Sequence, residues 1–264
     1  MIDIHSHILP GVDDGSPDDD ATSAMLSIAR QDGIVELTAT PHADLSYRFD
    51  PAHCRAEIER WAAASPDGPR LHLGCEVHLT PENLEAAVRT PRDYALGGRD
   101  CLLLELPNLA LASAIEPGIQ FLLEGGLRPI IVHPERNPLF LKEPFFAERL
   151  VDSGCFLQLT AQSITGSFGP DPQRLALSLL KNGLAHFVAS DAHGVDHRRP
   201  LLSTAFAEIE RRFSNELANL LFVDNPRAAL QGGRIDRARP PARSWVASFF
   251  RAQNAGRPER AGSA

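Results

Sequence analysis

The chain has 264 residues, of which 43% are hydrophobic and 23% are charged, so it can bury a full core in one large or two small domains. Its net charge of −8 argues against a nucleic-acid partner, and no run approaches the roughly 20 apolar residues that a membrane span requires. The N-terminus has no signal-peptide pattern and the four cysteines show no paired spacing, so we expect a cytoplasmic protein that is not embedded in a membrane.

Seven short apolar runs, rich in β-forming residues, alternate with helix-like stretches along the chain. The predicted strands are MIDIH, VELTAT, RLHLGCEV, DCLLLEL, RPIIVH, CFLQLT and AHFVAS. The predicted helices cover residues 19–31, 51–64, 116–124, 144–153, 172–181 and 202–213. Several strands are apolar almost throughout, as expected when both faces of a parallel sheet are buried. This alternation predicts an α/β barrel or a doubly wound sheet.

The last part of the chain has a different composition from the rest. Residues 232–264 contain seven arginines and only two acidic residues, begin with Gly-Gly and include Pro-Pro. We therefore expect a main domain at 1–231 and a basic C-terminal tail at 232–264. The tail has one short amphipathic piece around Trp245, Phe249 and Phe250. A solvated or body-docked tail is favoured over an anchor for a membrane or a partner.

The opening sequence MIDIHSHILPGVDDG places two histidines directly after a short strand-like run. Residues two apart in a strand face the same side, so His5 and His7 point together, with Asp13 and Asp14 on the loop beyond. Two neutral imidazoles and a carboxylate at a strand end suit a divalent metal ion. A surface strand that carries two histidines explains this segment equally well.

Nearly every predicted strand ends in a metal-ligand residue or a phosphate-binding residue. These residues are His5 and His7, His42, Glu76, Glu105, His133 with Arg136, and Asp191 with His193. Each of them alone has a structural explanation, such as a capping carboxylate or a core histidine. In a barrel of parallel strands all the C-terminal ends surround one face, whereas the outermost ends of an open sheet lie too far apart to share a site. Their joint placement therefore favours the barrel.

These motifs resemble the PHP (polymerase and histidinol phosphatase) superfamily. The matching segments are HSH, DDG, ATPH, GCE, LLLE, HPER and SDAH. More narrowly, the chain is similar to the metal-dependent bacterial protein tyrosine phosphatases of capsule and exopolysaccharide biosynthesis, over roughly residues 1–230. The resemblance implies a distorted (β/α)7 TIM-like barrel that holds three divalent metal ions, manganese foremost, with Fe, Zn or Mg as alternatives. It also implies a phosphotyrosine protein as substrate, namely the tail of a membrane-bound tyrosine autokinase.

The resemblance further implies nine metal ligands and two phosphate contacts. His5, His7, Glu76 and Asp191 are the implied shell of one ion, Glu76 bridges to a second ion held also by Glu105 and His133, and Asp14, His42 and His193 hold the third. The family pattern prefers Asp14 to Asp13, although spacing alone does not choose between them. Arg136 and Arg199 are the implied catalytic contacts to the phosphate, with Arg198, next to Arg199, as the alternative.

The residue types are consistent with this chemistry. Imidazole and carboxylate ligands without thiolate suit Mn, Fe or Zn. Neighbouring cations lower the pKa of a shared water, so that hydroxide forms near neutral pH and attacks phosphorus in line. The cations and an arginine stabilise charge on the equatorial oxygens, and no covalent protein nucleophile is required.

One segment suggests a different mechanism. HCRAEIER, residues 53–60, matches the His-Cys-x5-Arg string of cysteine-dependent tyrosine phosphatases. That mechanism needs a loop whose backbone N–H groups surround the phosphate. The five residues between Cys54 and Arg60 include no glycine and are good helix formers, and two of them are glutamates that would repel phosphate. We therefore do not expect Cys54 to be a nucleophile.

Three other functions were weighed against the phosphatase. An amidohydrolase would need a lysine at a strand end to bridge two metals, but the chain has only Lys142, in a predicted loop, and Lys181, near a helix end. A small-molecule phosphoesterase of the histidinol-phosphatase type stays open, because a metal shell does not encode the leaving group. A non-catalytic partner of an export complex also stays open. The physiological substrate, the metal loaded in the cell and the oligomeric state are not fixed by the sequence.

Overall fold

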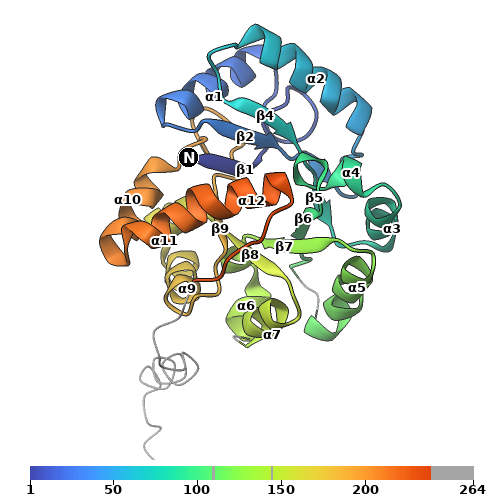
Figure 1. Ribbon diagram of the computed structural model, residues 1–264, viewed down its shortest axis with the longest axis vertical. Helices are drawn as coiled ribbons and strands as arrows, with labels where there is room; N and C mark the ends of the chain where they lie inside the picture. Colours follow the sequence, from blue (N-terminus) through green and yellow to red (C-terminus); the bar gives the residue numbers. More distant parts are fainter. Residues whose placement is uncertain (109–110, 144, 239–264) are drawn as a thin grey trace, which may run out of the picture.

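A computed structural model describes residues 1–108, 111–143 and 145–238 of the chain (Figure 1). Its strands are β1 (Ile2–Ser6), β2 (Glu36–Ala39), β3 (His42–Ala43), β4 (Arg70–Leu73), β5 (Glu76–His78), β6 (Cys101–Glu105), β7 (Arg128–Val132), β8 (Phe156–Thr160) and β9 (Phe187–Ala189). Its longer helices are α1 (Asp19–Gln31), α2 (Pro51–Ala64), α3 (Pro81–Arg89), α5 (Ala112–Glu124), α7 (Phe146–Asp152), α9 (Pro170–Lys181), α10 (Ser203–Arg212) and α12 (Asn225–Gln231). The predicted amphipathic piece around Trp245 lies outside the described residues.

Shorter helical segments complete the described chain. They are α4 (Pro91–Tyr94), η1 (Leu96–Gly98), η2 (Pro134–Arg136), α6 (Pro138–Lys142), α8 (Ala161–Thr165), α11 (Asn215–Asn219) and η3 (Leu220–Asp224). In Figure 1 the strands lie at the centre and the helices surround them. No helix within the described ranges is long and apolar enough to span a membrane.

The strands form two sheets, and every pairing between them is parallel. The smaller sheet has the order β1-β2-β4, and the larger has the order β3-β5-β6-β7-β8-β9. There are two sheets because β2, within the predicted strand VELTAT, stops before β3 begins, and because the predicted strand RLHLGCEV is interrupted between β4 and β5. Gly74 N donates to Ala39 O (2.9 Å) and Glu76 N donates to Pro41 O (3.1 Å), so hydrogen bonding continues across the interruption.

The first and last strands also lie next to each other. Ser6 forms a parallel bridge with Ala192, and Asp191 N donates to His5 O over 2.9 Å. The buried carboxylate of Asp3 supports this contact, because its Oδ1 accepts hydrogen bonds from Ser190 N (3.0 Å) and His5 N (3.3 Å). The fold is thus a mixed α/β arrangement of parallel strands in which the ends of β1 and β9 meet.

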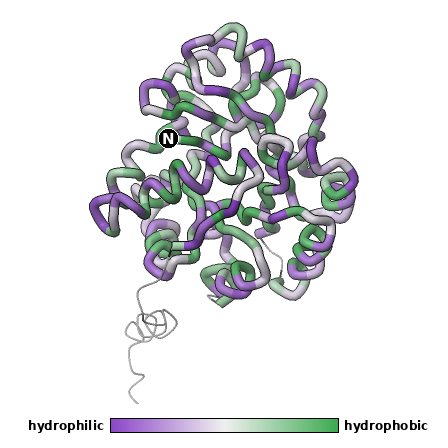
Figure 2. The backbone as a smooth tube through the Cα atoms, viewed as in Figure 1, coloured by the Kyte–Doolittle hydropathy of each residue, from purple (hydrophilic) through white to green (hydrophobic). Residues whose placement is uncertain are grey.

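Alternation along the strands divides the buried apolar side chains into two clusters. In β6, Cys101 and Leu103 belong to the smaller cluster, whereas Leu102 and Leu104 belong to the larger one beneath the helices. Glu105 continues the face of Cys101 and Leu103. Figure 2 shows the surrounding helices alternating between hydrophobic and hydrophilic segments, as expected for helices that cover a core with one face.

Most of the predicted elements are present. The predicted helices at 19–31 and 51–64 match α1 and α2, whose N-caps Asp18 and Asp50 accept backbone hydrogen bonds. The helix predicted at 116–124 begins earlier, at Ala112. Helices α3, α11 and α12 were not predicted. For α3 the signal was present, because Thr80 caps the helix and a proline follows at its first position.

A buried histidine at the amino end of β9, outside the groups of potential metal ligands, makes the stability of this fold depend on pH. His186 is 2% exposed, and its Nδ1 accepts a hydrogen bond from Leu157 N over 3.3 Å. Burial, reinforced by the nearby Arg237 guanidinium, lowers the pKa of His186 to about 4 from its usual 6.5. Between pH 6.5 and 4, His186 is therefore protonated in the unfolded chain but neutral in the folded chain. Acid thus favours unfolding in this interval.

We predict that His186→Gln weakens the acid-dependent loss of stability in this interval. In the wild type this histidine alone should remove up to roughly 3 kcal/mol of unfolding free energy between pH 6.5 and 4. Urea unfolding at several pH values measures the difference between variant and wild type. His197→Gln, at an exposed histidine, is the control and should leave the pH profile unchanged. Parallel profiles for wild type and His186→Gln would contradict the prediction.

Candidate metal centre

Two histidines at the end of β1 direct their ring nitrogens at each other. His5 Nε2 and His7 Nε2 are 3.2 Å apart, and both side chains are buried. Their other ring nitrogens have partners, because His5 Nδ1 contacts Gln158 Oε1 (2.8 Å) and His7 Nδ1 contacts Asp13 Oδ2 (2.7 Å). A neutral imidazole that donates from Nδ1 to an oxygen presents a lone pair at Nε2. Two such lone pairs repel unless a cation lies between them.

Two buried carboxylates complete the first group around these nitrogens. Glu76 Oε2 is 3.2 Å from Nε2 of both His5 and His7. Asp191 Oδ1 is 3.4 Å from His5 Nε2 and 3.6 Å from His7 Nε2. One potential ligand atom from each residue lies within 4.8 Å of all the others. The four residues predicted to share one ion are therefore together.

Glu76 also belongs to a second group, formed by the first residues of β3 and β5 and the last residue of β6. Ligand atoms of His42, Glu76 and Glu105 lie within 4.8 Å of one another. His133 contacts the other oxygen of the same carboxylate, with Nε2 2.9 Å from Glu76 Oε1. The predicted second set, Glu76, Glu105 and His133, thus lies around one carboxylate, and His42 adjoins it with Nδ1 3.1 Å from Glu76 Oε2.

The third group brings together the loop after β1 and the segments after β2 and β9. It contains His7, Asp14, His42 and His193. Asp14 Oδ1 lies 3.3 Å from His42 Nε2 and 3.4 Å from His193 Nε2. Asp13 is instead behind His7, where its Oδ1 also accepts from Gly15 N over 3.0 Å. Asp14 rather than Asp13 thus lies among the potential ligand atoms of this group, and the side chains of all nine predicted ligand residues lie close together.

The histidines and carboxylates of these groups change each other's pKa. Burial alone would raise the pKa of Glu76 and Asp191, yet neighbouring imidazoles, His5 foremost, hold both well below the usual range. Burial would lower the pKa of His7, but its hydrogen bond with Asp13 and the nearby carboxylates of Asp191 and Glu76 raise it well above 6.5. The buried carboxylates therefore require positive charge. A divalent cation would compete with these protons, so metal affinity should weaken as the pH falls.

Several buried polar atoms in the cluster also fit a metal better than a protein partner. Among the described residues, Glu76 Oε2, Asp191 Oδ1 and His42 Nδ1 are buried and have no hydrogen-bond partner. Buried polar atoms are rarely left unpaired, since each costs desolvation free energy. The donor set consists of imidazole nitrogens and carboxylate oxygens, which suit Mn, Fe or Zn. The residues thus fit a cluster of divalent cations.

Two arginines lie beside Asp191, and one of them is Arg198. Arg136 Nη1 and Arg198 Nη2 are each 2.5 Å from Asp191 Oδ2. Arg199 does not take this position, because its side chain is exposed to solvent. The backbone at Arg198 has φ of 51°, an uncommon value for a residue other than glycine. Arg198, the alternative to Arg199 in the sequence-based prediction, is therefore the arginine that pairs with Asp191.

Backbone strain is concentrated at this cluster. Within the described ranges, the residues other than glycine with positive φ are His133 (37°), Asp191 (53°) and Arg198 (51°). Such conformations cost free energy and persist where the surrounding structure imposes them. All three residues belong to the cluster or adjoin it. The fold thus uses strained positions to direct side chains toward one place.

Sequence reasoning missed the residues that support the ligands. Gln158 and Asp13 orient His5 and His7 through their Nδ1 atoms, as outer partners of metal-binding histidines do. The sequence did mark Gln158 as unusual, because it is a polar residue in the otherwise apolar run CFLQL. Gly15 is required by packing, since an added Cβ would lie 2.1 Å from His7 O.

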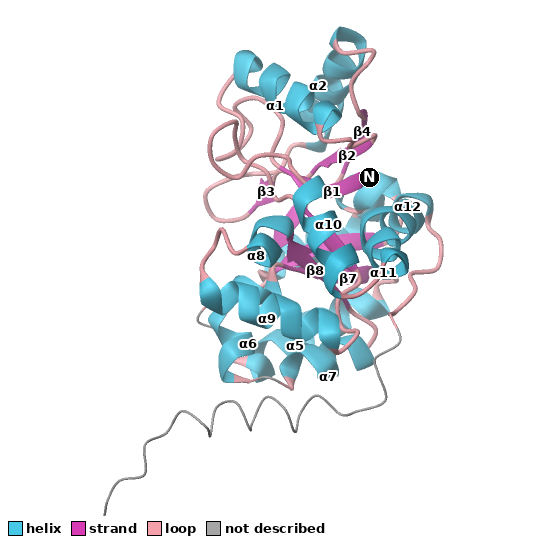
Figure 3. Ribbon diagram, turned by 90° about the vertical axis from the view of Figure 1, so that its left-hand side faces the viewer, coloured by secondary structure: helices cyan, strands magenta, loops and turns pink. Residues whose placement is uncertain are grey.

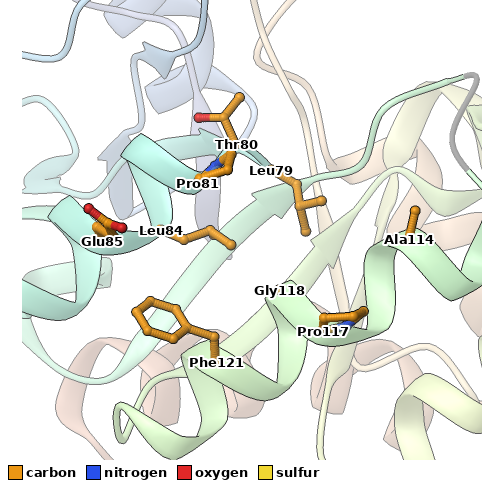
Figure 4. A pocket seen from close by; sticks show the side chains of 9 residues that line it. All are labelled: Leu79, Thr80, Pro81, Leu84, Glu85, Ala114, Pro117, Gly118 and Phe121. Carbon is orange, nitrogen blue, oxygen red and sulfur yellow. The ribbon is translucent and has the colours of Figure 1, made fainter.

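Two other features lie apart from the cluster. Cys54 is fully buried in α2, and burial raises the pKa of its thiol to about 12, so it is not a ready nucleophile. The groove between α3 and α5, of about 450 Å³, is lined mainly by apolar side chains (Figure 4). Its lining residues, which include Leu84 and Phe121, contain none of the nine predicted ligands.

Parallel strands whose carboxyl ends gather imidazoles, carboxylates and arginines define a metal-dependent hydrolase type of site. The sequence model of the family described as capsular polysaccharide synthesis, CpsB/CapC, matches residues 1–231. The chain therefore belongs to the CpsB/CapC family.

Named relatives of the chain are tyrosine-protein phosphatases. Over 257 residues the chain is 33% identical to tyrosine-protein phosphatase YwqE of Bacillus subtilis, covering 95% of this chain and 100% of the relative. It is 29% identical over 245 residues to the putative tyrosine-protein phosphatase CapC of Staphylococcus aureus, covering 91% and 95% of the two chains. It is 29% identical over 236 residues to CpsB of Streptococcus pneumoniae, covering 86% and 97%.

Solved structures support the family assignment, and further ones resemble the chain in fold. A chain from the crystal structures of YwqE and CpsB, described as unique metal-dependent tyrosine phosphatases, matches with a TM-score of 0.82 and 31% identity, covering 92% of this chain and 100% of the other. Dihydropyrimidinase from Brevibacillus agri matches with a TM-score of 0.53 and 14% identity, covering 90% and 73%. The second likeness concerns the fold alone.

We predict that Gly15→Ala disrupts the cluster without unfolding the protein. A methyl group 2.1 Å from His7 O would force the loop that carries Asp14 away from β1. Metal affinity should fall by roughly tenfold to a hundredfold, as for other losses of ligand support. Elemental analysis after equilibration with limiting Mn measures it. Gly233→Ala is the control, since its methyl would meet Ala228 Cβ at 3.3 Å, far from the cluster in the fold. Equal metal content in both variants would contradict the prediction.

Proposed function

We propose that this chain is a metal-dependent protein tyrosine phosphatase acting on a phosphotyrosine protein of capsule or exopolysaccharide synthesis. Membership of the CpsB/CapC family and the names of its relatives support this activity. The observation that carries the proposal is the opposition of His5 Nε2 and His7 Nε2 across 3.2 Å, with the oxygens of Glu76 and Asp191 beside them. A phosphate monoester is the substrate class that such a cluster with two arginines can bind and cleave.

The nine converging residues are proposed to hold three divalent ions, with manganese as the first candidate. His5, His7, Glu76 and Asp191 would hold one, Glu76, Glu105 and His133 a second, and Asp14, His42 and His193 the third. Bound cations would supply Lewis-acid charge and lower the pKa of a water. Glu76 would belong to both of the first two ligand sets, because its Oε2 faces His5 and its Oε1 faces His133.

The surrounding architecture is proposed to be a distorted (β/α)7 barrel of the PHP type, in residues 1–231, followed by a basic tail. The bridge between Ser6 and Ala192 supports this, as does the continued hydrogen bonding where β2 and β4 stop. In such a barrel the strand ends share one face, which accounts for the convergence of residues from β1, β5 and β6.

Arg136 and Arg198 are proposed to bind the phosphate. Each guanidinium uses one nitrogen on Asp191 Oδ2 and has further N–H donors for phosphate oxygens. Such donors contribute most when negative charge shifts during P–O cleavage. The proposed protein partner is the phosphotyrosine-containing tail of a membrane-bound tyrosine kinase.

We predict that chelation abolishes hydrolysis of a phosphotyrosine peptide and that Mn restores it, with histidinol phosphate as the comparison substrate. His42→Ala and Glu105→Ala should lose most activity, because each removes a proposed ligand. Cys54→Ser should keep nearly all of it, since the buried thiol has no role. Steady-state kinetics with elemental analysis measures these effects. An inactive but folded Cys54→Ser protein, or activity that survives chelation, would refute the metal mechanism. Faster turnover of histidinol phosphate would favour the small-molecule alternative.

We predict opposite results for two adjacent arginines. Arg198→Ala should lower kcat/KM by roughly two orders of magnitude or more, the usual cost of a lost transition-state donor. Arg198→Lys should recover only part of the lost kcat/KM, because an ammonium group cannot form the two parallel hydrogen bonds of a planar guanidinium. Arg199→Ala is the matched control and should stay within about twofold of wild type. Metal content and melting temperature should be measured for each protein. A severe defect in Arg199→Ala with a mild one in Arg198→Ala would restore the original assignment.

A further inference from the structure

Two aromatic side chains flank the cluster from different loops. The ring of Tyr47, after β3, lies 6.1 Å from the His42 ring and is tilted from it by only 19°. The ring of Phe168, after α8, lies 4.8 Å from Arg136 Cζ. One ring thus lies against a proposed metal ligand and the other against a proposed phosphate-binding arginine. Both side chains are partly exposed, so each has ring surface left to contact a bound molecule.

The loop that carries Tyr47 is held by its own hydrogen bonds. Asp44 Oδ1 accepts from Ser46 N (2.6 Å) and from Tyr47 N (2.8 Å), while Asp44 N donates to Tyr47 O over 3.0 Å. These bonds close a tight turn whose outermost side chain, Leu45, is 94% exposed. Tyr47 is therefore placed beside His42 by a built loop.

The loop that carries Phe168 is shaped by two glycines. Gly166 and Gly169 have φ of 87° and 93°, and Gly169 N donates to Gly166 O over 3.0 Å. Side chains larger than glycine are disfavoured at these angles, so the turn is specific. In Figure 3, β3 and α8 both lie on the side of the molecule away from the N-terminus. The two aromatic residues thus follow elements on the same side as the strand ends.

The chemistry of a phosphate ester explains what these rings can do. The polar cluster and the two arginines can bind the phosphate, but none of them distinguishes one leaving group from another. An aromatic leaving group can pack against protein rings in offset or edge-on arrangements, with centroids about 4.5–7 Å apart. An alkyl leaving group of serine or of a small metabolite lacks that surface. Discrimination between the two therefore belongs to the aromatic residues.

We propose that Tyr47 and Phe168 bind the ring of an aryl phosphate and thereby select phosphotyrosine over alkyl phosphates. This inference rests on the proposed phosphatase function and assigns the selection to two residues outside the metal-ligand set. Phe168 has a second role as a positioning residue, since it covers one face of the Arg136 guanidinium.

The test compares binding of phenylphosphonate and methylphosphonate to the Mn-loaded protein by calorimetry. Both present the same phosphonate to the cluster, and only one carries a ring. The wild type should bind phenylphosphonate more tightly, and Tyr47→Leu and Phe168→Leu should each reduce this ratio by roughly fivefold. Tyr47→Phe should keep the ratio, because the ring is retained. Phe121→Leu, at an aromatic residue in the separate groove of Figure 4, should also keep it.

Kinetics on the same preparations separates the two roles and the two hypotheses. With a phosphotyrosine peptide, Tyr47→Leu should mainly raise KM, whereas Phe168→Leu should also lower kcat because Arg136 is less well positioned. A wild type that binds the two phosphonates equally, or variants that keep the wild-type ratio, would overturn the aromatic selection. Ring-dependent binding without any hydrolysis of the peptide would overturn the phosphatase proposal and leave the aryl site in place.

Discussion

The constraint on which the structure depends is the buried carboxylate of Glu76. Its two oxygens lie within 3.2 Å of ring nitrogens of four histidines, His5, His7, His42 and His133. A carboxylate buried without compensating charge would cost several kcal/mol, so the fold must deliver positive charge to it. The histidines come from β1 and from the segments after β2 and β7, which therefore have to end at one place. Parallel strands satisfy this requirement because their carboxyl ends lie on the same side.

Asp191 shows how the same requirement shapes the backbone. This buried residue adopts φ of 53°, and its carboxylate meets three histidines on one oxygen and two arginines on the other. The strain is supported by a large apolar core on both sides of the strands. In a chain of net charge −8, the two arginines and bound cations would supply the positive field that an anionic ester needs. The aromatic rings of Tyr47 and Phe168 then act on the part of the substrate that carries no charge.

Local patterns were sufficient to predict much of this arrangement. Apolar runs located the parallel strands, and the helix-like stretches at 19–31 and 51–64 match the observed bounds of α1 and α2. The position of each potential ligand directly after a run of apolar residues predicted the convergence, because strand ends in such folds share a face. The family pattern also gave Asp14, which the geometry places in a group with His42 and His193. These features depend on residues a few positions apart in the chain.

The sequence by itself therefore predicted most of the alternation of strands and helices and, through the family resemblance, a set of candidate ligand residues that lie together in the fold. Only the tertiary structure decided which neighbour of a pair faces the cluster. Arg198 points to Asp191 and Arg199 to solvent because the backbone turns at φ of 51°, and Asp13 orients His7 because Gly15 packs against that histidine. Such choices depend on the sign of a backbone angle and on contacts between segments distant in sequence, neither of which has a local pattern.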